Sequence, residues 1–301
     1  MMNEARIMVG VNGTATASAA YYESLAYARE RKQGRKLGAR GGDMVPIIEH
    51  ADVRRMLLRQ KAIVEGSLAL LATVSRYDDV ATHGATDEAR ERADLLLNLL
   101  TPIAKTFPAE KGFEANVLAV QILGGYGYTS EYLPEAYLRD QKLNTLHEGT
   151  NGIQSMDLLG RKVMSKGGAP LRALAEEIGS TVARARKAGC DPELCSAIEE
   201  AVSTVGAITM ELGQRGMTGD ADAMLGHSWD YLDMFATLVI GWQWLNMAAA
   251  AKTAPLADAR KQAIDAAARY WIRTEIPRIT LLAELCRENE SSYIKAEPDW
   301  F

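Results

Sequence analysis

Long apolar segments with helical spacing dominate this 301-residue sequence, and stretches in which apolar and polar residues alternate are nearly absent. A strand with one buried face needs that alternation, whereas a helix buries residues three or four positions apart. Proline is scarce and stands mostly near the ends of the apolar segments. The sequence therefore predicts an all-α protein, and we expect no sheet.

The first half of the chain reads as a series of amphipathic helices separated by glycine, proline and polar turns. The helices are predicted over residues 3–32, from Pro46 to about 77, over 86–106 and 109–123, and then over 131–141 and 150–164. We expect a break near Pro108, because proline removes a helical hydrogen bond. Four long helices joined by short loops predict an antiparallel four-helix bundle.

The clearest linker is "SKGGAP" at 165–170, with two glycines and a proline after a predicted helix. It divides the chain into a bundle domain, 1–164, and a second helical domain, 165–301, with helices near 170–188, 192–215, 219–252 and 255–290. The run at 234–251 approaches the length of a membrane span but contains Thr237, Gln243 and Asn246. We therefore expect a buried helix there and no membrane span.

Composition excludes several classes of partner. A net charge of -5 leaves no electrostatic basis for binding nucleic acid or an anionic membrane. Three cysteines without metal-ligand spacing and no secretory signal indicate reduced, buried thiols in a cytoplasmic protein. The four histidines lack paired spacing, so no metal site is expected.

The stretch "LHEGTNG" places Glu148 just before a predicted helix start. A carboxylate there can serve only to stabilise the helix dipole. However, Gly149 removes side-chain cover beside the acid, Thr150 can cap by itself, and Asn151 and Gly152 are poor helix formers. This composition also fits a backbone that comes close to a ligand.

The stretch "QILGGYG" carries Gly124 and Gly125 directly after a predicted helix. Such a pair usually ends a helix. The functional alternative is that exposed main-chain N–H groups there meet an anion or the edge of a heterocycle.

Taken together, these stretches resemble the C-terminal signature of the flavin-dependent acyl-CoA dehydrogenases. The order of "QILGG-G" from Gln121, "LRD" at 138–140, and the acid-Gly-Thr from Glu148 carries the resemblance. Upstream, "NEARIMVG" and "YARERKQGR" keep the family's interval between Arg6 and Arg31. This part of the resemblance covers residues 1 to about 164.

The rest of the chain is similar to the longer branch of that family, which includes enzymes for methylthiopropionyl-CoA and long-chain acyl-CoA. The segments "SWDYLDMFATLVIGWQWLNMA" and "KAEPDWF" resemble its appended helical domain. Family members also carry a helical domain and a β domain before this region, and nothing in the sequence resembles either. The chain is expected to be a fragment, the product of a misplaced start, or a genuine half-enzyme.

The resemblance implies a FAD-dependent enzyme that oxidises acyl-CoA to trans-2-enoyl-CoA and passes electrons to an electron-transfer flavoprotein. Glu148 would take the α-proton, and its own main-chain N–H would donate to the thioester oxygen. The β-hydrogen would leave as hydride to the flavin. Alone, without the β domain, the chain is expected to be inactive.

The resemblance also assigns binding roles, residue by residue. Arg31 and Gln33 match contacts to the pyrophosphate and adenosine of FAD, usually on a neighbouring subunit, so a homodimer or higher oligomer is expected. The remaining assignments are FAD for Gln121, Gly124, Gly125 and Thr150, and acyl-CoA for Asn3, Arg6 and Gly149. The sequence departs from common family patterns at Gly34-Arg35, where Phe-Gly is frequent, at Gly152, where a glutamine is common, and at His147, which replaces a tyrosine.

Simpler roles and other functions stay open at the level of sequence. Arg31 alone would be a solvated surface charge, Asn3 and Arg6 a helix-start cap and charge, and His147 either a tuner of the base or a wall residue. The chain could instead be a helical partner subunit that supplies Glu148 to another chain. A relative of the DNA-associated alkylation-response type is disfavoured by the net charge, and the sequence does not specify the acyl group.

Overall fold

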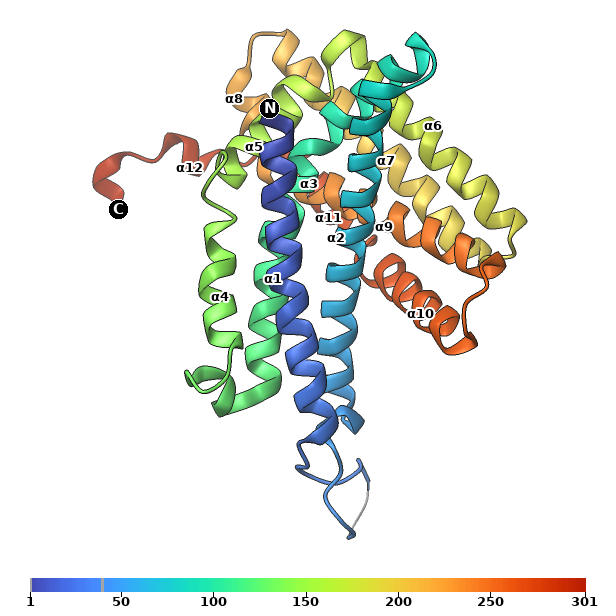
Figure 1. Cartoon of the computed structure of the whole chain (residues 1–301). Helices are drawn as coiled ribbons and strands as arrows, with labels where there is room; N and C mark the ends of the chain where they lie inside the picture. The colour runs from blue at the N-terminus through green and yellow to red at the C-terminus, as the bar shows by residue number, and fades with distance from the viewer. Residues whose placement is uncertain (1, 39–40) are drawn as a thin grey trace. The chain divides into compact units, whose positions relative to one another are not determined.

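The structure, a computed structural model, describes residues 2–38 and 41–301. Within these residues the regular structure is helical, and β pairing is limited to one isolated antiparallel bridge between Lys32 and Pro46. The prediction of an all-α fold is confirmed. Figure 1 shows the helices in chain order.

The helices have the following bounds. In the first half they are α1 (Met2–Glu30), α2 (Ala51–His83), α3 (Asp87–Leu123), α4 (Pro134–Leu143) and α5 (Asn151–Asp157). In the second half they are α6 (Ser165–Lys187), α7 (Pro192–Met217), α8 (Ala221–Leu225), α9 (Ser228–Thr253), α10 (Asp258–Thr274), α11 (Arg278–Glu288) and α12 (Ser292–Lys295). Short 3-10 turns lie at Ile47–Glu49, Gly124–Tyr128 and Pro298–Trp300, and a π-helical turn at Leu158–Lys162.

The chain forms two compact units. The first contains residues 1–71 and 104–150, and the second contains residues 72–103 and 151–301. Helices α2 and α3 therefore contribute one part to each unit. The division into domains at residues 164 and 165 stays a prediction.

The first unit is built from α1, the start of α2, the end of α3, and α4, with successive helices running in opposite directions (Figure 1). Polar contacts tie its helices together. Ser24 of α1 donates to Gln60 of α2 at 3.3 Å. Arg59 of α2 forms a forked ion pair with Glu114 of α3, with a longer arm of 3.1 Å. These contacts fix how the helices of the bundle lie along one another.

Helix α3 continues through Pro108, so the predicted break there is wrong. Proline has no N–H, and the carbonyl of Ala104 therefore receives no helical hydrogen bond from that position. Gly10 of α1 lies so close to this oxygen that a Cβ would overlap it, and Gly13 packs on the carbonyl of Pro108. The Gln141 amide of α4 donates to the same Pro108 carbonyl at 2.9 Å. Contacts from α1 and α4 thus offset what the proline removes from α3.

Other predicted segments are divided differently in the structure. The segment 219–252 is two helices, α8 and α9, because Gly226 and His227 interrupt it. The segment 255–290 contains α10 and α11, separated just before Arg278 by Pro277. Within the predicted linker, Lys166, Gly167 and Gly168 leave the helical region with positive φ angles.

The second unit is organised around α9, which packs against α6, α7, α10 and α11. Leu232, Phe235, Val239 and Trp242 of α9 are all buried. Among the described residues, the stretch Ala221–Thr253 is long and apolar enough to span a membrane, but 83% of its apolar window is buried inside the structure. The prediction of a buried helix over 234–251 is confirmed, and the three cysteines are buried and free.

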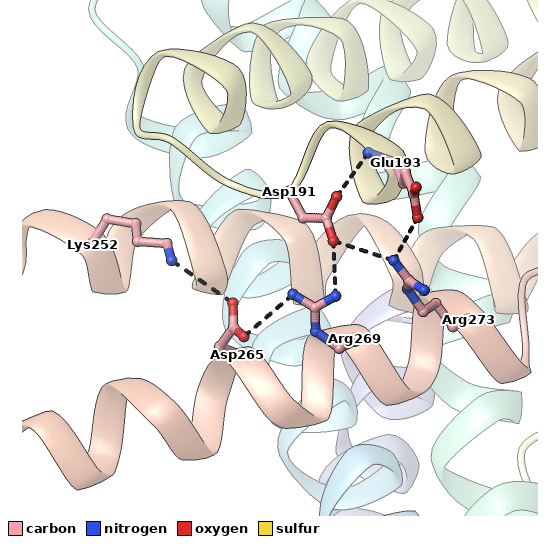
Figure 2. A network of polar contacts seen from close by, with 6 residues as sticks. All are labelled: Asp191, Glu193, Lys252, Asp265, Arg269 and Arg273. Atoms are coloured by element: carbon pink, nitrogen blue, oxygen red, sulfur yellow. Dashed lines mark hydrogen bonds and ion pairs between the residues drawn. The ribbon is translucent and has the colours of Figure 1, made fainter.

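A polar network joins the start of α7 to α10 (Figure 2). Asp191 caps α7 by accepting a hydrogen bond from the backbone N–H of Glu193 at 3.0 Å, and it accepts another from Arg269 at 2.8 Å. Arg273 reaches both Asp191, at 3.3 Å, and Glu193, at 2.6 Å. The cap hydrogen bond, followed by Arg269, lowers the pKa of Asp191. The network therefore keeps the cap charged and holds α10 at the start of α7.

The close contact between α1 and α3 can be tested by substitution of Gly10. Gly10→Ala should lower the free energy of unfolding by about 1–3 kcal/mol, because a methyl group would be forced onto the Ala104 carbonyl. Gly206→Ala is the matched control, since a Cβ at this helical position of α7 meets nothing within 4 Å. The control should be neutral or stabilising by up to about 1 kcal/mol in denaturant unfolding. Equal effects of the two changes would contradict the close approach.

Candidate functional site

The Glu148 loop, residues 144–150, leaves the end of α4 through a series of tight turns. Backbone N–H groups of Asn144, Thr145 and Leu146 each bond a carbonyl three residues earlier, at 3.0–3.1 Å. Asn144 and Thr145 are buried, which anchors the start of the loop. His147 is half-buried, and its ring lies 3.5 Å from the Asn144 side-chain oxygen.

Glu148 has a left-handed backbone, with a φ of 56°, and Gly149 follows with a φ of 85°. Among the described residues, the other non-glycine residues in this region are Lys166 and Asn289. The left-handed conformation costs an L-residue roughly 1–2 kcal/mol, and such strain clusters at functional sites. Glu148 is nevertheless an exposed residue.

The first turns of α1 approach the same region. Arg6 is half-buried and Asn3 is partly exposed. Arg6 and Glu148 both interact electrostatically with Lys105, a fully buried residue of α3. The structure thus brings Arg6 and Glu148 around one buried amine. Lys105 was not predicted from the sequence, although a lysine inside the apolar run "LLTPIAKTF" was a signal for it.

A surface pocket of about 320 Å³ lies at the opposite end of the bundle, where α1 ends, α2 begins and α3 ends. Four of the residues assigned to FAD meet there, namely Arg31, Gln33, Gln121 and Gly124. The other lining residues are Tyr27, Gly34, Ile47, His50, Val53, Ile122 and Leu123. Residues far apart in the sequence are therefore gathered into one concave site.

The guanidinium of Arg31 is arranged to receive an anion. It lies 5.7 Å from the ring centroid of Tyr126, and it reaches the Gln33 side-chain oxygen only at 3.5 Å. Its Nε is buried and has no hydrogen-bond partner among the described residues. A buried donor without a partner is costly, and a bound anion would satisfy it.

Backbone pairing holds this arginine segment in place. The N–H of Ile47 donates to the Arg31 carbonyl at 2.8 Å, and the N–H of Gln33 donates to Val45 at 3.0 Å. The His50 ring nitrogen lies 2.7 Å from the Gln33 carbonyl oxygen. His50 was not predicted from the sequence, because its partner is a backbone atom on another segment of the chain.

Three tyrosines form one wall beside the pocket. Tyr27, Tyr126 and Tyr132 have ring centroids 5.5–6.5 Å apart. Burial raises the pKa of Tyr27, while Arg31 opposes that change. The arrangement offers flat apolar surface next to a cation.

Gly124 and Gly125 follow the end of α3, and a Cβ at either position would meet nothing within 4 Å. Gly124 has a φ of 62°, which favours glycine as a helix stop. A side chain at Gly125 would meet no neighbouring atom, so packing does not explain why this residue is a glycine. The open space at both positions is compatible with a ligand lying against the backbone.

The structure separates the assigned residues into two sets. Gly149 and Thr150 adjoin Glu148 in the chain, and Asn3 and Arg6 belong to the same end of the bundle. The pocket around Arg31 lies at the other end of α1, whose 29 residues span about 44 Å. A dinucleotide is much shorter than this, so one bound molecule cannot contact both sets within one chain.

No candidate metal site is present in the part of the chain that the structure describes. No group of three or more His, Cys, Asp or Glu side chains there is placed to hold a metal ion.

Comparison with known protein families shows to which family the chain belongs. The family model described as "Acyl-CoA dehydrogenase, C-terminal domain" matches residues 1–164, which is more than half of the chain. The chain belongs to the acyl-CoA dehydrogenase family. A second family model, described as "Acetyl-CoA dehydrogenase C-terminal like", matches residues 174–297. The family predicted from the motifs is confirmed.

Individual members of the acyl-CoA dehydrogenase family show the same relationship. A 3-methylmercaptopropionyl-CoA dehydrogenase from Ruegeria pomeroyi is 39% identical over 259 residues, covering 85% of this chain and 43% of that protein. A broad-specificity linear acyl-CoA dehydrogenase from Mycobacterium tuberculosis is 31% identical over 264 residues, covering 84% of this chain and 43% of that protein. The chain therefore spans less than half the length of these relatives.

Solved structures of the family share the fold. An acyl-CoA dehydrogenase from Bacillus anthracis, complexed with FAD, has a TM-score of 0.74 and 20% identity, and covers 95% of this chain and 48% of that chain. The Caenorhabditis elegans protein ACDH-11, in complex with C11-CoA, also has a TM-score of 0.74, at 19% identity over 92% of this chain and 43% of that chain. At these identities the likeness concerns the fold alone.

The backbone of Glu148 can be tested separately from its carboxylate. Glu148→Gly and Glu148→Ala remove the same charge, but only glycine adopts a left-handed backbone freely. The glycine variant should be more stable than the alanine variant by roughly 1 kcal/mol in urea unfolding.

The control pair is Asn12→Gly and Asn12→Ala, at an exposed position inside α1. There the order should reverse, and alanine should be the more stable by about 1 kcal/mol. The same order at both positions would refute the left-handed conformation of Glu148.

Proposed function

We propose that this chain is the C-terminal part of a FAD-dependent acyl-CoA dehydrogenase that oxidises an acyl-CoA thioester to a trans-2-enoyl-CoA, with Glu148 as the base. Membership of the family supports the reaction class. The observation that carries the assignment of the base is that Glu148 is an exposed residue on a strained, left-handed backbone. A residue that only stabilised a helix start would need no such conformation.

In this reaction the carboxylate must remove a proton from a very weak acid, the Cα–H of a thioester. The α-proton of a thioester leaves only if the charge that develops on the thioester oxygen is stabilised at the same time. Glu148 accepts the α-proton, so the Cα–H bond breaks and an O–H bond forms on the carboxylate. Its own backbone N–H is assigned as one donor to the thioester oxygen. One residue then supplies both the base and part of the stabilisation of the enolate.

The neighbours of Glu148 fit a site for the acyl thioester. Gly149 adds no side chain beside the carboxylate, which leaves room for the acyl group. Asn3 and Arg6, from the first turns of α1, are assigned to the acyl-CoA. Removing water from this region as the substrate binds would strengthen each of these interactions.

The residues of the Arg31 pocket fit the adenosine and pyrophosphate of FAD. Arg31 offers a charged donor without a partner, and Gln33 and Gln121 offer amide groups. Gly124 and Gly125 leave the backbone open. Thr150, at the other end of the bundle, is assigned to the pyrophosphate. When bound, FAD supplies the acceptor for the hydride that leaves Cβ.

The separation of these two sets supports assembly with a second copy. The pocket of one chain would hold the adenosine end of a cofactor whose reacting end lies beside Glu148 of another chain. A homodimer or higher oligomer follows from this proposal. An electron-transfer flavoprotein is the proposed acceptor of the electrons, and a cytoplasmic location is the proposed setting.

The same separation favours one alternative. The chain would then be a helical partner subunit that completes the site of a different chain carrying the domains found in longer relatives. The nucleotide sequence directly upstream separates the two proposals. An in-frame β-domain pattern favours the dehydrogenase, and a separate adjacent gene for those domains favours the partner subunit.

Glu148→Gln tests the role of the base in the protein completed with the domains that precede this region in its relatives. The change should slow reduction of bound flavin by acyl-CoA by about 10²–10⁴-fold, since the amide cannot take the proton. The measurement is anaerobic bleaching of the flavin absorbance. Glu131→Gln, an equal loss of charge at an exposed position of the same unit, should leave the rate unchanged. Rapid reduction in the Glu148 variant would remove it from this role.

Arg31→Ala tests the pocket with ADP as the probe, in the 301-residue chain itself. Loss of a charged donor should weaken ADP binding, measured by calorimetric titration, by about 10–100-fold. Arg29→Ala removes an equal charge at an exposed position near the same helix end and should have little effect. Identical affinities of the two variants would show that the pocket does not bind the nucleotide through Arg31.

A further inference from the structure

Lys105 has no exposed surface, and it is among the largest fully buried side chains of the structure. Lysine is almost never buried to this extent without charged partners. Three charged groups interact with it electrostatically, namely Arg6 on α1, Glu110 on α3, and Glu148 in the loop after α4. The buried amine is thus surrounded by charges from each of these elements.

The position of Lys105 in the bundle is fixed on both sides. The preceding residue, Ala104, has its carbonyl against Gly10 of α1. The Gln141 amide of α4 holds the carbonyls of Pro108 and Ala109 at 2.9 and 3.1 Å. Contacts from α1 and α4 thus hold the α3 backbone on both sides of Lys105.

The four groups balance in charge, with two cations and two carboxylates. Burial lowers the pKa of Lys105 to about 8, and Arg6 acts in the same direction, while Glu110 and Glu148 oppose the change. The ammonium form therefore persists at neutral pH.

A base that works beneath a bound substrate faces a physical difficulty. When water leaves, burial favours the protonated carboxyl, which cannot accept a proton. A cation nearby favours the ionised form, and a buried cation is screened little by salt. When the α-proton moves to Glu148, the charge of the cluster rises by one as the enolate gains one negative charge.

We propose that Lys105 is a positioning residue for the proton-transfer step, whose buried ammonium keeps Glu148 in its carboxylate form when the acyl group excludes water. The inference rests on the proposed function of Glu148 as the base. Lys105 acts through Glu148, and it needs no contact with the substrate.

The first experiment measures Lys105 itself in the 301-residue chain, labelled with ¹³C at the lysine ε-carbons. The buried lysine should titrate at about pH 8, apart from surface lysines near about 10.4. Glu148→Gln should lower the midpoint of that titration by about one unit, since a neighbouring negative charge is removed. Glu131→Gln should leave it unchanged. An unmoved midpoint in the Glu148 variant overturns the proposal.

The second experiment measures flavin reduction against pH in the completed protein. Lys105→Met should move the acidic limb of the profile to higher pH by about one unit or more, and Lys105→Arg should restore it. A rate lowered equally at every pH, with the limb in place, would indicate a purely structural role and overturn the proposal. The titration still reports on the Lys105–Glu148 coupling if Glu148→Gln leaves flavin reduction intact. Failure of the proposed function can therefore be told apart from failure of this inference.

Discussion

The first unit depends on the contact between Gly10 and the Ala104 carbonyl. Proline inside a helix usually ends or bends it, because one hydrogen bond is lost and the ring crowds the preceding turn. Here Gly10 of α1 packs directly on the carbonyl that is left without a helical donor. A glycine Cα–H can make a weak contact with such an oxygen, which any larger residue would prevent. The interaction therefore fixes the distance between α1 and α3.

That distance sets the site at the Glu148 end. It places Arg6 and Lys105, from two helices, around the loop that follows α4. The Gln141 amide adds α4 to the same frame, so the loop starts from a fixed point. A rigid frame of this kind allows a short loop to hold a strained residue, because the packed helices around it compensate the cost.

The sequence predicted the helical class and most segments, because apolar periodicity over long stretches is a strong signal. The predicted break at Pro108 was wrong, because Gly10, which packs on this part of α3, lies far away in the sequence and no local pattern reveals the contact. The resemblance named Arg31, Gln33, Gln121 and Gly124, and the structure gathers these residues in one pocket.

Two residues of the candidate site escaped the sequence analysis for different reasons. His50 contacts a backbone carbonyl, which carries no signal in the side-chain pattern. Lys105 stands in an apolar run, which is a signal of burial, but its electrostatic neighbours Arg6 and Glu148 are distant in the sequence. The proposed role of Glu148 requires an exposed residue. The sequence does not reveal exposure, and the structure shows it.

The left-handed backbone at Glu148 affects how well the protein would tolerate a mutation to glycine at this position. Glutamate and glycine codons differ by a single base, and glycine is the residue that this backbone prefers. A mutation to glycine would therefore yield a chain that folds at least as well as the original while lacking the carboxylate. Cellular quality control removes unstable proteins, so it would not remove this one. Such a chain would persist in the cell without the carboxylate.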